Sequence, residues 1–109
     1  MPVNIEKNMI IRGARKNKSG IWKRIAELLS RPRKRSVEVN VGKLDKLAQE
    51  GETLIVPGKV LGRGTVTKKF TVIAFAYSDS ARERLSKAGC KVELLRDWTG
   101  KDISGRIVI

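Results

Sequence analysis

Apolar residues in the first half of the chain recur at helical spacing. Between residues 19 and 30 they occupy the i, i+3/i+4 and i+7 positions of one buried face, while Lys23, Arg24 and Glu27 lie on the opposite face. The apolar set is Ile21, Trp22, Ile25, Leu28 and Leu29. Pro32 ends this predicted helix, because the residue before a proline disfavours helical backbone angles.

Two further helices are predicted in this half on shorter patterns. The first spans residues 4–17, and the second spans residues 42–50 and is terminated by Gly51. Their expected inward side chains are Ile5, Met9, Ile10 and Ala14 in the first helix, and Leu44, Leu47 and Ala48 in the second.

Strand patterns dominate the second half. Predicted strands cover residues 52–57, 60–61, 69–77, 91–95 and 106–109, and residues 35–41 form either a short strand or an extended entry. The run 69–77 is apolar almost throughout, which indicates burial on both faces, as in α/β domains. A helix follows Ser78-Asp79, with Ser80 and Glu83 spaced as a capping box and Gly89 as its terminator. We therefore predict a mixed α/β domain over residues 19–109, preceded by a basic helical arm over residues 1–18.

Positive charge is unevenly distributed along this pattern. The chain of 109 residues has 24 Lys and Arg against 11 Asp and Glu, a net charge of +13. Residues 1–46 hold 13 basic and 4 acidic side chains (net +9), which leaves 11 and 7 (net +4) for the remainder. Such asymmetry indicates a nucleic acid or an anionic membrane as partner, because cations that meet phosphates release condensed counterions.

Most catalytic and metal-binding chemistry lacks its usual residues. The chain has no histidine and one cysteine, so we expect no zinc site, no other metal, no cofactor and no catalysis. Cys90 is expected to pack at the start of a strand. Asp79 and Glu83 have the spacing of Mg²⁺ ligands, but a solvated helix start explains them better, because Arg82 and Arg84 flank Glu83. No apolar run approaches the ~20 residues that cross a bilayer, and residues 1–8 contain no signal-peptide core.

A glycine-rich segment, Pro57–Gly64, joins two of the predicted strands. Its glycines fit neither the phosphate-binding P-loop nor the dinucleotide fingerprint. Two compatible interpretations remain. Gly58, Gly62 and Gly64 supply positive φ angles for tight turns, or their missing side chains let the backbone approach a phosphate. The cations that would neutralise this phosphate are Lys59, Arg63, Lys68 and Lys69.

Several long motifs resemble one known family. They are Ile21-Trp22-x-x-Ile25-Ala26-Glu27-x-Leu29, Arg31-Pro32-Arg33-Lys34, Val37-Glu38-Val39-Asn40-Val41 and Val56-Pro57-Gly58-Lys59-Val60-Leu61-Gly62-x-Gly64. Together they resemble archaeal large-subunit ribosomal protein eighteen-e, a family related to bacterial large-subunit protein fifteen. The resemblance covers roughly residues 19–109 and is poor over the first 18.

This resemblance implies a structural constituent of the large ribosomal subunit in the cytoplasm, folded as an irregular superhelical domain of β-β-α units. It also implies that the chain binds and stabilises folded large-subunit ribosomal RNA beside neighbouring ribosomal proteins, with no membrane and no small-molecule substrate. Charge and matched motifs together predict RNA contacts at Arg12, Arg15, Lys16, Lys18, Lys23, Arg24, Arg31, Arg33, Lys34, Arg35, Asn40, Lys43, Gly58, Lys59, Gly62, Arg63, Gly64, Lys68 and Lys69.

Alternative functions are also compatible with the charge. The chain would otherwise be a free-standing nucleic-acid-binding protein or RNA chaperone, or a nuclease that uses Asp79, Glu83 or Asp97 with Mg²⁺. An anionic-membrane binder is disfavoured, because no basic amphipathic helix has the large aromatic face that this role requires.

Overall fold

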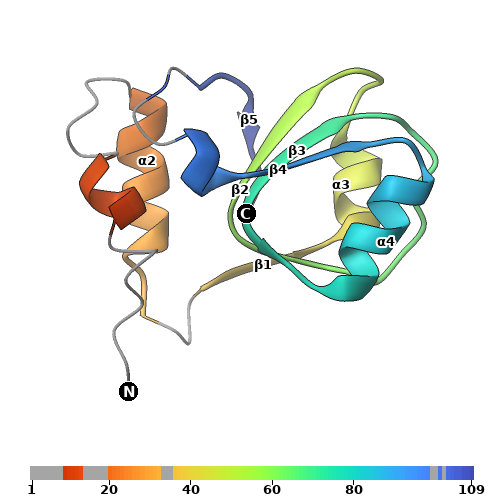
Figure 1. Ribbon diagram of the computed structural model, residues 1–109, viewed down its shortest axis with the longest axis horizontal. Coiled ribbons are helices and arrows are strands. Elements are labelled where there is room, and N and C mark those ends of the chain that lie inside the picture. Colours follow the sequence, from red (N-terminus) through yellow and green to blue (C-terminus); the bar gives the residue numbers. More distant parts are fainter. Residues whose placement is uncertain (1–8, 14–19, 33–35, 99–100, 102) are drawn as a thin grey trace.

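The chain folds into three layers in the computed structural model, which describes residues 9–13, 20–32, 36–98, 101 and 103–109. A central sheet separates α2 and residues 9–13 on one side from α3 and α4 on the other (Figure 1). In chain order the elements are α2 (Gly20–Leu29), β1 (Val37–Asn40), α3 (Val41–Leu47), β2 (Thr53–Leu61), β3 (Thr71–Tyr77), α4 (Asp79–Lys87), β4 (Lys91–Leu94), the 3₁₀ helix η2 (Leu95–Trp98) and β5 (Arg106–Ile107). The predicted α/β class is confirmed.

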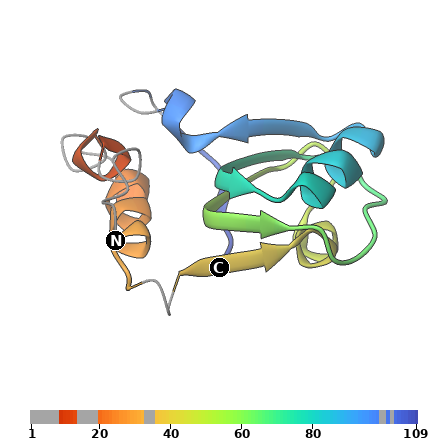
Figure 2. The same cartoon turned by 60° about the horizontal axis from the view of Figure 1, so that its bottom comes forward.

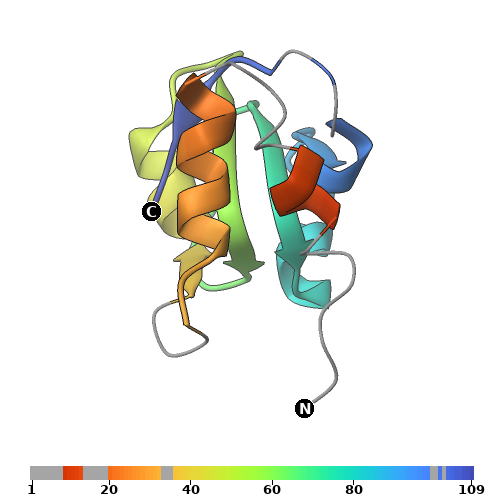
Figure 3. The same ribbon diagram turned by 90° about the vertical axis from the view of Figure 1, so that its left-hand side faces the viewer.

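All pairings in the sheet are parallel, in the order β1-β2-β3-β4. The two ends of β2 have different neighbours, because β1 pairs with Gly58–Leu61 whereas β5 pairs with Leu54 and Ile55. Between these ends the register of β2 and β3 shifts at Val56/Lys59, and both strands bend together (Figure 1). The bend lets the sheet curl around α3 and α4, while α2 crosses the outer face (Figures 2 and 3).

Each face of the sheet has its own apolar core, which explains the near-continuous apolar run of β3. The inner core joins Val72 and Ala74 of β3 to Leu44 of α3 and Leu85 of α4. The outer core joins Ile73 of β3 to side chains of α2, residues 9–13 and η2. At its centre Trp22 is fully buried, and its indole N–H donates to the carbonyl of Lys101 at 2.9 Å. Trp22 therefore packs in the core, as its place on the apolar stripe predicts.

Several element boundaries differ from those that local patterns predict. The predicted strands 52–57 and 60–61 are joined in one strand, β2, because β5 pairs with its first half and β1 with its second half. The hydroxyl that caps α4 belongs to Ser78, which accepts from the Ala81 N–H at 3.2 Å, so the predicted capping box at Ser80 is wrong. Met9 and Leu47 were expected to face inward, yet they are 64% and 40% exposed, respectively. Tertiary packing orients these two short helices differently. Ile5 and Ala14 lie outside the described residues.

The glycines of the Pro57–Gly64 segment have different roles from one another. Only Gly64 has a positive φ, of 106°, so the predicted turn role is wrong for Gly58 and Gly62. A Cβ on Gly58 would lie 2.1 Å from the Val37 carbonyl oxygen, and one on Gly62 would lie 2.1 Å from the Ser80 hydroxyl oxygen. Both positions therefore need glycine because another part of the chain occupies the space that a side chain would fill.

Candidate nucleic-acid interface

The strongest cluster of predicted RNA-contacting residues lies where β1 and β2 end. Parallel strands bring their carboxyl ends to the same edge, so the turn after β1 meets the loop after β2. The Gly42 N–H donates to the Arg63 carbonyl at 3.0 Å, and the Arg63 N–H donates to Asn40 Oδ1 at 3.2 Å. We call this cluster the carboxyl-end site; it surrounds a hollow of about 520 Å³ and comprises Asn40, Gly42, Lys43, Asp45, Lys46, Arg63, Gly64 and Thr65.

Close backbone contact between two glycines builds this site. A Cβ on Gly64 would lie 2.5 Å from the Gly42 Cα, and one on Gly42 would lie 3.0 Å from the Gly64 Cα. Gly64 also needs its positive φ, which residues with side chains rarely adopt. Glycine at both positions therefore lets the two loops cross and brings the side chains that flank them, Lys43 and Arg63, to one surface.

Cations surround the carboxyl-end site. Lys43, Lys46 and Arg63 are all exposed. Arg84, on the exposed side of α4, donates from Nη1 to the Gly64 carbonyl at 3.1 Å. Neither Arg84 nor Lys46 is among the contact residues that the sequence predicts. Arg84 could not be found from local patterns, because only the folded chain places α4 beside the loop that contains Gly64. The arrangement can neutralise several phosphates, and each arginine fork can contact two phosphate oxygens at once.

Asp45 lies beneath the site. Among the residues that the structure describes, it is the one charged residue that is buried, with 9% exposure. Its carboxylate accepts from the N–H groups of Thr67 and Lys68 and from the Thr67 hydroxyl, each at 2.9 Å. Burial by itself would raise the pKa of Asp45, but these hydrogen bonds outweigh burial and hold the pKa below its usual value of 3.8. The ionised carboxylate therefore fixes the loop between Thr65 and Lys68 to α3.

Replacing Asp45 with alanine is expected to lower the free energy of unfolding by about 2–4 kcal/mol at neutral pH, because two backbone donors lose their acceptor. In the wild type, the pKa of Asp45 is lower in the folded than in the unfolded chain. Its contribution is therefore complete above pH 3.8 and disappears as the pH falls through the folded value. Urea unfolding from pH 2 to pH 7 measures both effects.

Two variants control for this prediction. Asp45→Asn keeps an acceptor and should cost less than Asp45→Ala, with a weaker dependence on acid. Glu83→Gln removes an exposed carboxylate paired with Lys87 at 2.9 Å and is expected to change stability by under about 0.5 kcal/mol. An unchanged acid dependence in Asp45→Asn would show that other groups cause it.

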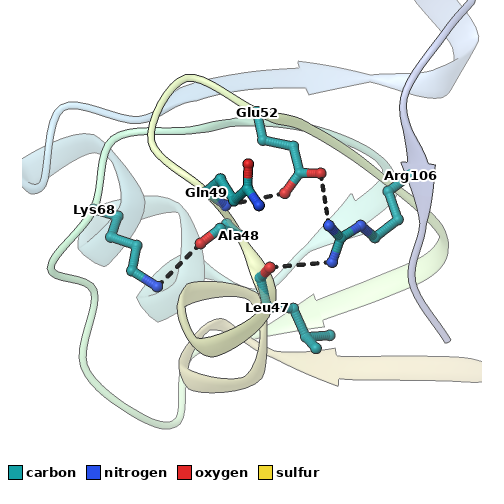
Figure 4. A network of polar contacts seen from close by, with 6 residues as sticks. All are labelled: Leu47, Ala48, Gln49, Glu52, Lys68 and Arg106. Atoms are coloured by element: carbon teal, nitrogen blue, oxygen red, sulfur yellow. Dashed lines mark hydrogen bonds and ion pairs between the residues drawn. The ribbon is translucent and has the colours of Figure 1, made fainter.

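Lys68 lies at the opposite end of α3, where its charge is used within the protein. Its ammonium group donates to the carbonyls of Asp45 and Ala48 at 2.8 and 3.0 Å. Arg106 donates to the Leu47 carbonyl at 3.1 Å and pairs with Glu52 at 3.0 Å (Figure 4). Cations suit the carboxyl terminus of a helix, whose last carbonyls lack partners within the helix. Lys68 thus supports the fold of α3 and is not one of the cations around the carboxyl-end site.

The remaining predicted contact residues that the structure describes lie outside the carboxyl-end site. Arg12, Lys23, Arg24, Arg31, Lys59 and Lys69 are exposed, and Arg24 pairs with Glu27 at 3.3 Å. Gly58 and Gly62 pack against the protein itself, as described above. Arg15, Lys16, Lys18, Arg33, Lys34 and Arg35 lie outside the described residues.

Other reactive groups do not converge on this surface. Cys90 is buried immediately before β4, close to its predicted place at the start of a strand, and its thiol donates to the Lys68 carbonyl at 3.3 Å. Burial raises the pKa of Cys90, which disfavours the nucleophilic thiolate. Over the described part of the chain, no group of three or more Asp, Glu, Cys or His could hold a metal ion. Within that same part, no helix is both long and apolar enough to span a membrane.

Comparison with known proteins gives concordant matches. The family of ribosomal proteins that unites 50S-L15 and 50S-L18e with a 60S counterpart matches residues 38–93. The chain is 40% identical to Large ribosomal subunit protein eL18 of Methanopyrus kandleri, over 98% of this chain and 91% of that protein. It is 36% identical to the eL18 protein of Archaeoglobus fulgidus, over 94% and 90%, and 43% identical to that of Nanoarchaeum equitans, over 84% and 80%.

Proposed function

The chain belongs to the family of ribosomal proteins 50S-L15 and 50S-L18e, and we propose that it stabilises folded large-subunit ribosomal RNA through the carboxyl-end site and the basic surface of α2. As a member of this family it is a structural component of the large ribosomal subunit and not an enzyme. Its place is therefore in the ribosome, a cytoplasmic particle, beside neighbouring ribosomal proteins.

The main support for the proposal is the cluster of cations around the point where the loops that contain Gly42 and Gly64 cross. Lys43, Lys46 and Arg63 are exposed there, and Arg84 joins them from α4. The acid within the cluster, Asp45, is buried and directed at the Thr67–Lys68 backbone, so its charge is largely satisfied inside the protein. A phosphate approaching from solvent would therefore meet mainly positive charge.

The exposed side of α2 supplies a second basic surface. Lys23 and Arg24 of α2 are exposed, as is Arg31 just after the helix, while the opposite side of the helix is buried in the outer core. Arg33, Lys34 and Arg35 follow in the sequence. The planar guanidinium groups of these arginines suit bidentate phosphate contacts and stacking on unpaired bases.

The mode of binding that we propose is recognition of RNA shape and backbone. Aromatic residues make up 5% of the chain, and Trp22 is buried, so an extended stacking platform for single-stranded RNA is not evident in the described residues. With ~6–10 phosphate contacts, affinity should fall by about 10³–10⁵ between roughly 50 and 200 mM salt.

Sedimentation of a cell lysate through a density gradient containing Mg²⁺, followed by immunodetection of the chain, tests the proposed location. We expect near-stoichiometric migration with large subunits. A nuclease-treated lysate is the control, because the signal should leave the subunit fractions when ribosomal RNA is degraded. Recovery of the chain only at the top of the untreated gradient would favour a free-standing nucleic-acid binder and contradict the proposal.

A further inference from the structure

A second hollow lies on the outer face of the sheet, beyond the bend and beside the carboxyl end of α2. Its volume is about 470 Å³, within the range of ~300–1,000 Å³ typical of small-molecule sites. Figure 3 shows α2 crossing this face of the sheet. We call this hollow the outer groove; it is lined by Leu28, Leu29, Ser36, Val37, Glu38, Pro57, Gly58, Lys59, Phe75 and Ala76.

More than half of the lining of the outer groove is apolar, and it includes one aromatic ring. Phe75 packs against the outer core but is only partly buried. Pro57 and Leu29 are buried, so they provide a fixed surface next to this ring. An apolar recess with a partly exposed aromatic ring suits a flat, apolar-faced group, and every nucleobase has such a face.

Two opposite charges also line the outer groove. Glu38 of β1 and Lys59 of β2 are partners in the sheet register, and both are exposed. Alternation along the strands directs them to the outer face, because Val37, Val39 and Val60 next to them are in the inner core. Lys59 provides a cation for a phosphate, and Glu38 provides an acceptor for an amino group.

We propose that the outer groove binds a single unpaired base of RNA that has an exocyclic amino group, namely adenine, cytosine or guanine. The base stacks on Phe75, its amino group donates to the Glu38 carboxylate, and Lys59 neutralises an adjacent phosphate. This inference rests on the proposed function, since it requires RNA as the partner. It goes further, because the protein would recognise one base of the RNA in addition to contacting the RNA backbone.

The surrounding charge favours RNA over a peptide as the occupant. Arg31 is exposed just beyond the carboxyl end of α2, and the chain as a whole has a net charge of +13. Such a surface attracts a polyanion and repels the basic segments common among nucleic-acid-binding proteins. The carboxylate of Glu38 repels phosphate, so it selects a group that donates hydrogen bonds, as an amino-bearing base edge does.

Affinity of the full chain for purified large-subunit ribosomal RNA, measured as a function of salt, tests the inference. Phe75→Leu is expected to weaken binding about tenfold through reduced stacking, with an unchanged slope of log K against log salt, because every phosphate contact is retained. Phe75→Tyr retains a stacking ring and should bind within about twofold of the wild type. Wild-type affinity in Phe75→Leu would overturn the inference.

Glu38→Ala keeps the test decisive if Phe75→Leu lowers stability, because Glu38 is exposed and lies outside the core. We expect about tenfold weaker binding, consistent with the loss of one hydrogen bond to a base. We also expect increased reactivity of one adenine, cytosine or guanine toward dimethyl sulfate or kethoxal. Unchanged affinity and unchanged reactivity of every adenine, cytosine and guanine in Glu38→Ala would overturn the proposal. Failure of the wild-type chain to bind the RNA at all would refute the proposed function itself.

Discussion

Replacing Gly58 with alanine is expected to lower the free energy of unfolding by about 3–5 kcal/mol, a loss at the upper end for single substitutions. The new Cβ would lie 2.1 Å from the Val37 carbonyl oxygen and 2.7 Å from the Val37 Cβ. The Val37 carbonyl carbon, at 2.8 Å, is also too close, and neither backbone atom nor the Cβ can be moved by rotating a side chain, so the overlap persists. Alanine also loses less backbone freedom than glycine on folding, but that gain is only about 0.5–1 kcal/mol.

Urea unfolding followed by circular dichroism measures this loss, and Gly20→Ala is the matched control. Gly20 begins α2, and a Cβ there would have no neighbour within 4 Å. The control should be neutral or slightly stabilising, because alanine favours helix over glycine. A Gly58→Ala chain as stable as Gly20→Ala would mean that β1 does not pack against β2 as the structure describes.

Removing two cations from the carboxyl-end site, with Lys43→Ala and Arg63→Ala combined, is expected to weaken binding to large-subunit ribosomal RNA by about 10²-fold. Charge-assisted hydrogen bonds contribute about 1.5–3 kcal/mol each, and both side chains are exposed beside the Gly42–Gly64 crossing. The slope of log K against log salt should become shallower by about 0.7–0.9 for each phosphate that is no longer neutralised. A salt titration of the binding constant gives both quantities.

Lys87→Ala combined with Lys91→Ala is the matched control, because it removes the same total charge. Lys87 ends α4 and Lys91 begins β4, so both lie near the amino ends of the strands, away from the carboxyl-end site. This control should change affinity only a few-fold through the general field of the protein. Equal losses in the two double variants would show that net charge alone, without a localised site, holds the RNA.

Local patterns in the sequence were sufficient to predict the strongly periodic elements. Helix α2 and its buried face follow from residues 19–30, because a regular apolar stripe can be buried in only one orientation. The same is true of β3, whose continuous apolar run requires cover on both faces. The excess of positive charge and the family motifs likewise indicated ribosomal RNA without knowledge of the fold.

Short elements and the candidate sites required the tertiary structure. Thr53–Leu61 form one strand because β1 and β5 pair with its two ends, and those partners are distant in the sequence. Arg84 reaches the carboxyl-end site only because α4 packs beside the loop after β2. Phe75 lines the outer groove together with Leu28 and Leu29 of α2, from which it is more than 40 positions distant in the sequence. The sequence thus determined the strongly amphipathic elements and the total charge, since these depend on near neighbours and composition. The close glycine contacts and the grouping of cations were decided by the fold, since only the fold brings residues 20 or more positions apart into contact.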